Sequence, residues 1–151
     1  MKNKLHWRII LNYTLLIAWM VVIFLLSSEG KAVSTGRSDM IVETLQNFGV
    51  SGQTDLLTFI VRKSAHFIAY LVLGILAYNT FGIHKFKSRI LFMLSSGLVI
   101  LYAVSDEIHQ LLVPGRSGEI RDVLIDSSAG IIGICLAHIV LRLRQHKSSA
   151  I

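Results

Sequence analysis

Three short groups of ionisable residues border long apolar runs in this chain of 151 residues. They occupy residues 62–66 (Arg-Lys-Ser-Ala-His), 106–110 (Asp-Glu-Ile-His-Gln) and 116–126, which holds two arginines and three acids. Insertion scales put the cost of one Asp, Lys or Arg at a membrane centre at roughly 2.5–3.5 kcal/mol. The three groups are therefore expected to meet in a shared polar site rather than to face lipid.

Helical spacing arranges these residues in three polar lines, each at the end of an apolar segment. The lines comprise Arg62, His66 and Tyr70; Tyr102, Asp106 and His109 or Gln110; and Asp122, Asp126, Gly130 and Gly133. Pairing inside a helix bundle keeps such charges out of lipid. We therefore expect a cleft, lined by the three lines and open to one side of the membrane.

The residue types indicate acid–base or anion-binding chemistry. His66, Asp106 and His109 are the catalytic candidates, and we expect Asp106 and His109 to face the inside of the bundle together. Arg116 follows a Pro-Gly turn, whose rigid backbone could hold the guanidinium over a phosphate or carboxylate. The other candidates, all for ligand binding, are Arg62, Lys63, Tyr70, Glu107, Gln110, Asp122 and Asp126.

Structural roles compete with these interpretations. Snorkelling to the interface is the favoured account of Lys63, and a helix N-terminus alone could explain Asp122. Asp106 and Glu107 point about 100° apart on a helix, so one ligand group is not expected to contact both.

Metal binding has a weak sequence signal. Histidines and aspartates at positions 66, 106, 109 and 126 are of metal-ligating types. However, Asp-Glu-Ile-His lacks the two histidines on one helical face that define a zincin helix. The sequence therefore assigns no metal and leaves any cofactor unknown.

Composition places the chain among integral membrane proteins. Apolar residues make up 53% and charged residues 16%, whereas about 25% is usual in soluble proteins. The net charge of +6 comes from basic residues spread over loops and termini, without the basic stripe of a nucleic-acid-binding protein. No nucleic-acid partner is expected. The single cysteine, Cys135, forms no intramolecular disulfide.

Four apolar segments approach the roughly 20 residues that a membrane-spanning helix needs. They cover about residues 9–26, 65–83, 90–111 and 123–141. The first is too long for a typical signal peptide and is interpreted as a retained span. We therefore expect an all-α bundle of four transmembrane helices that forms a single domain over residues 1–151.

The segment between the first two spans predicts an additional helix. Ser38 resembles an N-cap, and Ile41, Leu45 and Phe48 share one face, which is typical of a short amphipathic helix on the membrane surface. A further helix is expected to start at Thr54 or Asp55 and to run into the second span.

Basic residues in short loops predict the orientation. The side with the termini holds Lys2, Lys4, Arg8, Lys85, Lys87, Arg89, Arg142, Arg144 and Lys147; the other side holds Lys31, Arg37, Arg62, Lys63, Arg116 and Arg121. Both termini are therefore expected in the cytoplasm, with the amphipathic helix and the polar lines on the outer side.

Four motifs, taken together, resemble the VanZ-like family, named after a membrane protein linked to low-level teicoplanin resistance in Gram-positive bacteria. They are Lys63-Ser-Ala-His66-Phe-Ile-Ala-Tyr70, Ser105-Asp-Glu-Ile-His-Gln110, Pro114-Gly-Arg116 and Asp122-Val-Leu-Ile-Asp126, with Gly130 and Gly133 following. The resemblance covers about residues 62–135. It implies a small multi-pass protein of the bacterial plasma membrane. Positions that match the family pattern are Lys63, His66, Asp106, Glu107, His109, Gln110, Arg116 and Asp122; at position 126 the family commonly has Asn.

Three functional hypotheses follow. The leading one is that the outward-facing cleft binds an anionic lipid or lipid-linked cell-envelope precursor and so contributes to resistance to teicoplanin-type glycopeptides. The alternative is a membrane-embedded hydrolase or transferase that acts on lipid-linked substrates by acid–base or metal-assisted catalysis. In it, His66 or His109 is the general base, oriented by Asp106, and Arg116 stabilises negative charge. The third is a structural partner of wall-synthesis enzymes. The sequence leaves the ligand and the oligomeric state open.

Overall fold

The chain is all-α over the residues that the computed structural model describes, 2–149. The helices are α1 (Lys2–Ser27), α2 (Lys31–Asn47), α3 (Thr54–Gly82), α4 (Ser88–Gln110) and α5 (Ile120–Ser149). Four of them contain stretches long and apolar enough to cross a membrane: Asn3–Ser27, Thr54–Gly82, Ser88–Gln110 and Ile120–Leu143. The predicted fold class, an all-α protein with four candidate spans, is confirmed.

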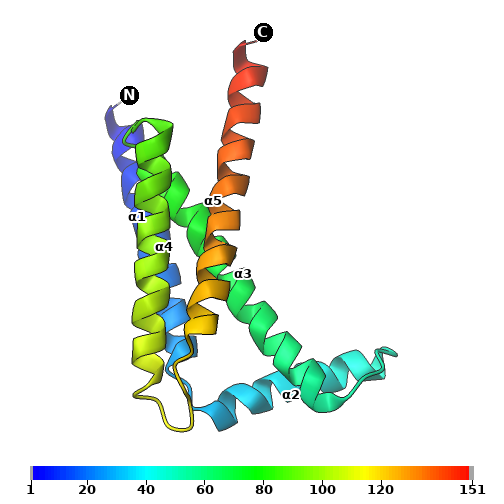
Figure 1. Ribbon diagram of the computed structural model, residues 1–151. Coiled ribbons are helices and arrows are strands. Elements are labelled where there is room, and N and C mark those ends of the chain that lie inside the picture. Colours follow the sequence, from blue (N-terminus) through cyan, green and yellow to red (C-terminus); the bar gives the residue numbers. More distant parts are fainter. Residues whose placement is uncertain (1, 150–151) are drawn as a thin grey trace.

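Helices α1, α4 and α5 run lengthwise, α3 crosses them obliquely, and α2 lies across one end (Figure 1). The two termini lie at the opposite end. The end with α2 also holds the start of α3, the end of α4, the loop 111–119 and the start of α5; we call it the polar end. All three ionisable groups identified in the sequence therefore lie at one end of the molecule. The side chains of Lys2, Arg144 and Lys147, used in the orientation count, lie outside the described ones.

One predicted helix boundary needs correction. The surface helix begins at Lys31, and Gly30 rather than Ser38 occupies its N-cap position. The Ser38 hydroxyl instead donates to the Ser34 carbonyl oxygen at 3.1 Å, a back-bond typical of serine within a helix. No proline precedes residue 38 in this segment, so nothing stops the helix from extending back to residue 31.

The expected restart of helix at Thr54 is confirmed, and α3 continues without a break into the second span. Hydropathy had suggested a span only from residue 65, because it detects the part of a helix that lies in lipid and not its extension beyond. This extension carries Phe59, Arg62 and Lys63 to the polar end.

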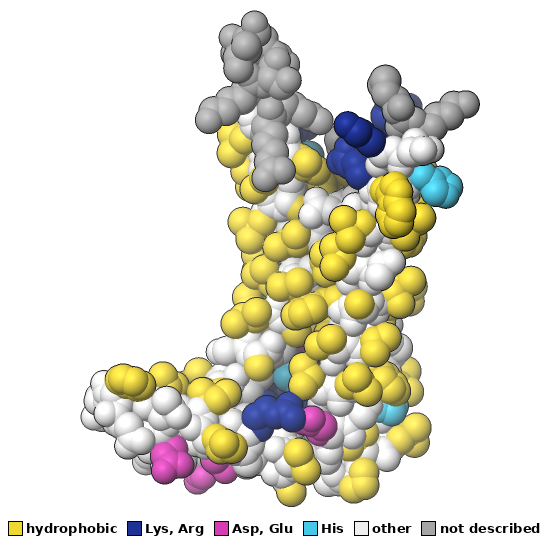
Figure 2. All heavy atoms as spheres, turned by 180° about the vertical axis from the view of Figure 1, so that it is seen from behind, with side chains coloured by type: hydrophobic (Ala, Val, Ile, Leu, Met, Phe, Trp, Pro, Cys, Tyr) yellow, Lys and Arg dark blue, Asp and Glu magenta, His cyan; other side chains and the backbone are white. Residues whose placement is uncertain are grey.

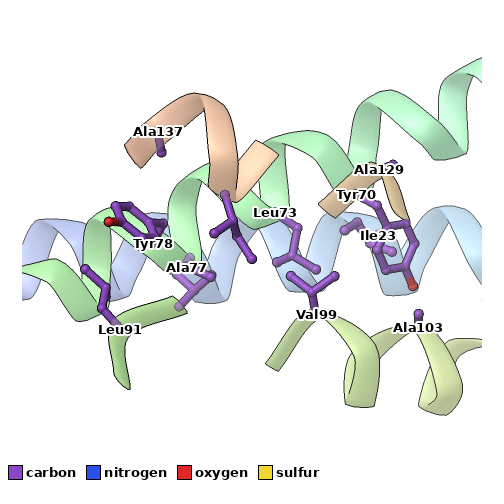
Figure 3. Close-up of a cluster of buried hydrophobic side chains, with 12 residues drawn as sticks. Ile23, Tyr70, Leu73, Ala77, Tyr78, Leu91, Val99, Ala103, Ala129 and Ala137 are labelled. Carbon is purple, nitrogen blue, oxygen red and sulfur yellow. The ribbon is translucent and has the colours of Figure 1, made fainter. Parts of the chain in front are cut away.

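The core lies along α3, where Tyr70, Leu73 and Ala77 face Val99 and Ala103 of α4 (Figure 3). Glycines bring α3 and α5 together: a Cβ at Gly74 would overlap the backbone of Gly130, and one at Gly133 would overlap the Leu71 carbonyl oxygen. The predicted close packing at Ala129 and Gly133 is confirmed, since both are buried. This contact fixes how α5 is rotated, and hence where its acidic end points.

Hydrophobic side chains cover the outer surface of the long helices (Figure 2). Leu101 of α4 is 70% exposed and Leu143 of α5 is 64% exposed. Such a continuous apolar surface is far larger than soluble proteins tolerate, and it suits contact with lipid. The fold is therefore that of a membrane protein whose acidic side chains gather at one end.

Candidate functional site

A polar cavity of about 120 Å³ lies at the polar end, between α3, α5, the last residue of α4 and the loop that follows it. Since a water molecule occupies about 30 Å³ of the liquid, the space suits a small polar group. Its charged lining is mainly basic. The cations are Lys31, Arg62, Lys63, Arg116 and Arg121, and the acids are Glu119 and Asp122. The cavity is therefore built to attract an anion.

Ion pairing leaves most of these cations free. Lys63 pairs with Asp122, which joins α3 to α5, and both side chains are largely buried. Snorkelling therefore does not account for Lys63. Among the described residues, no ion pair within 4.0 Å includes Arg62, Arg116 or Arg121.

Arg116 is held in place by its turn and by two hydrogen bonds. Its backbone N–H donates to the Val113 carbonyl oxygen at 3.1 Å, and Gly115 adopts φ +74°, as the predicted tight turn requires. Its Nε donates to the Glu29 carbonyl oxygen at 3.0 Å and its Nη1 to Gln110 Oε1 at 3.3 Å. Burial, and then the proximity of a second arginine, lowers the pKa of Arg116, although arginine remains charged at neutral pH.

Glu107 and Gln110 connect α4 to the loop. Glu107 Oε2 accepts a 2.8 Å hydrogen bond from the backbone N–H of Glu119. Gln110 Nε2 donates to Glu107 Oε1 at 3.2 Å and to Asp106 Oδ2 at 3.4 Å. Gln110, four residues from Asp106 and three from Glu107, thus lies between the two carboxylates and contacts both; whether a ligand group contacts both stays a prediction.

His109 and Asp106, both predicted to face inward, have different neighbours. Its Nε2 lies 3.1 Å from Ser28 Oγ, and its ring packs on Phe24 of α1 with 4.6 Å between ring centroids. Asp106, by contrast, is 4% exposed and turned to the interior. Residues three apart on a helix differ by about 60° in direction, which is enough for His109 to face a different neighbour.

A cluster of two buried aspartates and one half-buried histidine lies next to the cavity. It consists of His66, Asp106 and Asp126, whose nearest ligand-type atoms all lie within 4.8 Å of one another. His66 Nδ1 is 3.8 Å from Asp126 Oδ2. His66 also lines the polar cavity, so it connects the cluster to it.

The remaining candidate, Tyr70, is fully buried in the core and does not line the cavity. Sequence analysis missed Lys31, Phe59, Ser117, Glu119 and Arg121 as lining residues. Arg121 and Glu119 belong to the third ionisable group, residues 116–126, and could have been included among the candidate site residues. Lys31 had no signal, because it reaches the site only through the packing of α2, where its N–H donates to the Pro114 carbonyl oxygen at 3.4 Å.

A second cavity of about 110 Å³, mostly apolar, lies between α1, α2 and α3. Ile23, Leu26, Ile41 and Val61 are among its lining side chains. It shares three residues with the polar cavity: Arg62, His66 and Arg116. These three side chains therefore form the boundary between the polar cavity and the apolar one.

Together, the fold and the site define a multi-pass, all-α membrane protein with a cationic cavity at one end. The chain matches the sequence model of the VanZ/LLP1 family over residues 12–141, and it belongs to this family. The resemblance of its motifs is thereby confirmed, and the match extends beyond them into α1. No curated protein and no solved structure matches the chain significantly.

Proposed function

We propose that the protein binds the anionic head group of a membrane lipid or of a lipid-linked cell-envelope precursor in the polar cavity. The observation that carries this proposal is the surplus of cations: five against two acids, of which one, Asp122, is already paired with Lys63. Guanidinium groups suit phosphate because they donate hydrogen bonds in a planar fork. Arg116 is the central residue, since its turn and hydrogen bonds fix its position before a ligand arrives.

The neighbouring apolar cavity supports an amphipathic ligand. Arg62, His66 and Arg116 border both spaces, so a phosphate held by the arginines would have apolar side chains of α1 and α2 beside it. A free phosphate ion would use only the polar space. Lipid attachment therefore accounts for both cavities with one ligand.

Such binding on the outer face of a bacterial plasma membrane would bear on antibiotic action. We infer from the family resemblance that a lipid-linked precursor held here becomes less accessible to membrane-anchoring glycopeptides such as teicoplanin. This part of the proposal depends on the polar end facing outward, which the excess of Lys and Arg on the side of the termini supports.

Lipid retention in native mass spectrometry tests the proposal. Nanodiscs containing either an anionic phospholipid or an isoprenyl phosphate would be used to load wild type, Arg116→Gln and the control Arg89→Gln. The control makes the same charge change at the opposite end, on exposed Arg89. Losing a charge-assisted hydrogen bond costs about 1.5–3 kcal/mol, so Arg116→Gln is expected to weaken lipid retention roughly tenfold or more. Equal retention by all three proteins would refute the proposal. A lipid that wild type does not retain would be excluded as the ligand class.

Catalysis is a second candidate, favoured by the position of His66. This histidine lines the cavity and has Asp126 within 3.8 Å, so Asp126 rather than Asp106 is the carboxylate placed to orient it as a general base. The same lipid assay separates the two functions when its products are also analysed. His66→Gln should retain lipid but lose conversion if the protein is an enzyme. No conversion by wild type would leave binding alone.

A further inference from the structure

Two aspartates come together inside the bundle without a lysine or arginine partner among the described residues. Asp126 is 2% exposed and Asp106 is 4% exposed, although both belong to helices long enough to span a membrane. No Lys or Arg lies within 4.0 Å of either carboxylate among the described residues. The nearby Lys63 is already paired with Asp122.

Their hydrogen bonding is also incomplete. Asp106 accepts a long 3.4 Å bond from Gln110. Among the described residues, Asp126 Oδ2 has no hydrogen-bond partner; it lies 3.8 Å from His66 Nδ1, and one ligand-type atom from each of His66, Asp106 and Asp126 lies within 4.8 Å of the others. A buried carboxylate oxygen without a partner is costly, and two carboxylates close together repel each other strongly at low dielectric.

We propose that His66, Asp106 and Asp126 bind a divalent metal ion. One cation would neutralise both carboxylates and give Asp126 Oδ2 the partner it lacks. The inference goes beyond lipid binding and does not depend on it, because it rests on this cluster rather than on the cavity's arginines.

The donor set and its geometry indicate which ion. One imidazole nitrogen and two carboxylate oxygens suit Zn²⁺ or Mn²⁺, whereas an all-oxygen set would suit Mg²⁺ or Ca²⁺. Ligand atoms of a tetrahedral zinc site lie roughly 3.4 Å apart, so the three atoms, which lie within 4.8 Å of one another, would have to approach by about an ångström. Three protein ligands leave a position open for water or a ligand atom, as in catalytic zinc sites. Because His66 lines the polar cavity, the ion would lie at its edge.

Metal retention tests the site. The full-length protein, purified in mild detergent without an affinity tag, is stripped with a chelator, incubated with Zn²⁺ or Mn²⁺ and separated from free ions by gel filtration. Elemental mass spectrometry is expected to find one ion per chain for wild type, and a loss of most of it in Asp106→Asn and Asp126→Asn. Asp55→Asn, which makes the same change at an exposed position outside the cluster, should retain the wild-type amount.

Thermal unfolding gives a second readout, which can be made on the wild-type protein alone. The ion should raise the melting temperature of wild type, because binding to the folded state alone stabilises it. Without metal, Asp126→Asn should unfold at or above the wild-type temperature, since it removes one of two repelling charges. If a variant fails to fold, metal retention and the metal-dependent melting temperature of the wild-type protein decide whether the site exists. Absence of bound ion in wild type, or equal loading of wild type and cluster variants, overturns the metal site. A proton shared between Asp106 and Asp126 would then be what relieves the repulsion between the two carboxylates.

Discussion

At the scale of single residues, Glu107 shows that a polar side chain beside the cavity can hold the structure together instead of binding a ligand. Its side chain accepts hydrogen bonds from Gln110 and from the backbone of Glu119. Gln110 in turn accepts from Arg116. Although it was expected to bind ligand, Glu107 is placed to hold the loop against α4 and so to position Arg116; we propose that this is its role.

Replacing Glu107 tests this positioning role. Glu107→Ala and Glu107→Gln both remove the charge, but only Gln keeps an oxygen that can accept from the Glu119 N–H. The alanine variant should therefore be less stable than the glutamine variant by roughly 1–3 kcal/mol, the cost of leaving a partly buried donor unpaired. Chemical unfolding of both in detergent measures the difference. Equal stabilities would mean that water satisfies the Glu119 N–H and that the contact does not hold the loop.

How much of the site could be predicted is clearest in the sequence Asp-Glu-Ile-His-Gln. Its acids, histidine and glutamine were identified from their types and their place beside an apolar run. Which of them turn inward depends on the rotation of α4, and that is set by contacts such as Val99 with Gly130. Local spacing allowed either His109 or Gln110 to follow Asp106. Packing, which involves residues far apart in the chain, places Gln110 there and His109 against Phe24.

At the scale of helices, the contact between α3 and α5 determines whether the site forms at all. It carries the Lys63–Asp122 pair and brings His66 to Asp126. Close approach is possible only because glycine presents no side chain toward the partner backbone at positions 74 and 133.

Adding a single methyl group tests this contact. A Cβ at Gly133 would meet the carbonyl of Leu71, which is backbone and cannot move aside alone. Gly133→Ala should therefore destabilise the fold by roughly 1–3 kcal/mol and weaken every interaction between α3 and α5. Gly97→Ala is the matched control, because nothing lies within 4 Å of the added carbon. It should be neutral or stabilising by up to about 1 kcal/mol, the difference in helix propensity. Thermal unfolding of both variants measures the effect, and similar melting temperatures would show that the helices separate without cost.

At the scale of the whole molecule, hydropathy was sufficient to predict the number of spans, because each must present a long apolar stretch to lipid. It was not sufficient for the shape of the polar end. Helix α2 lies across that end because of contacts that no local pattern contains, such as the hydrogen bond from Thr58 to Asp39, at 2.6 Å. The same packing brings Lys31 to the cavity.

The distribution of charge along the molecule leads to the prediction on which the proposed function most depends. Figure 2 shows acidic side chains only at the end with α2, whereas Lys and Arg side chains are seen at both ends. By sequence, nine Lys and Arg residues belong to the side with the termini and six to the side with α2. Short loops rich in Lys and Arg stay in the cytoplasm, so the polar end should face outward.

With Cys135 replaced by serine, a cysteine introduced at Gln46 of α2 should react with a membrane-impermeant maleimide in intact cells. One introduced at Lys87, between α3 and α4, should react only after lysis. Both positions are exposed in the fold, so accessibility within the protein does not bias the comparison. The reverse pattern would turn the cavity toward the cytoplasm; its arginines could still bind an anionic lipid there, but the link to glycopeptides acting from outside would be lost.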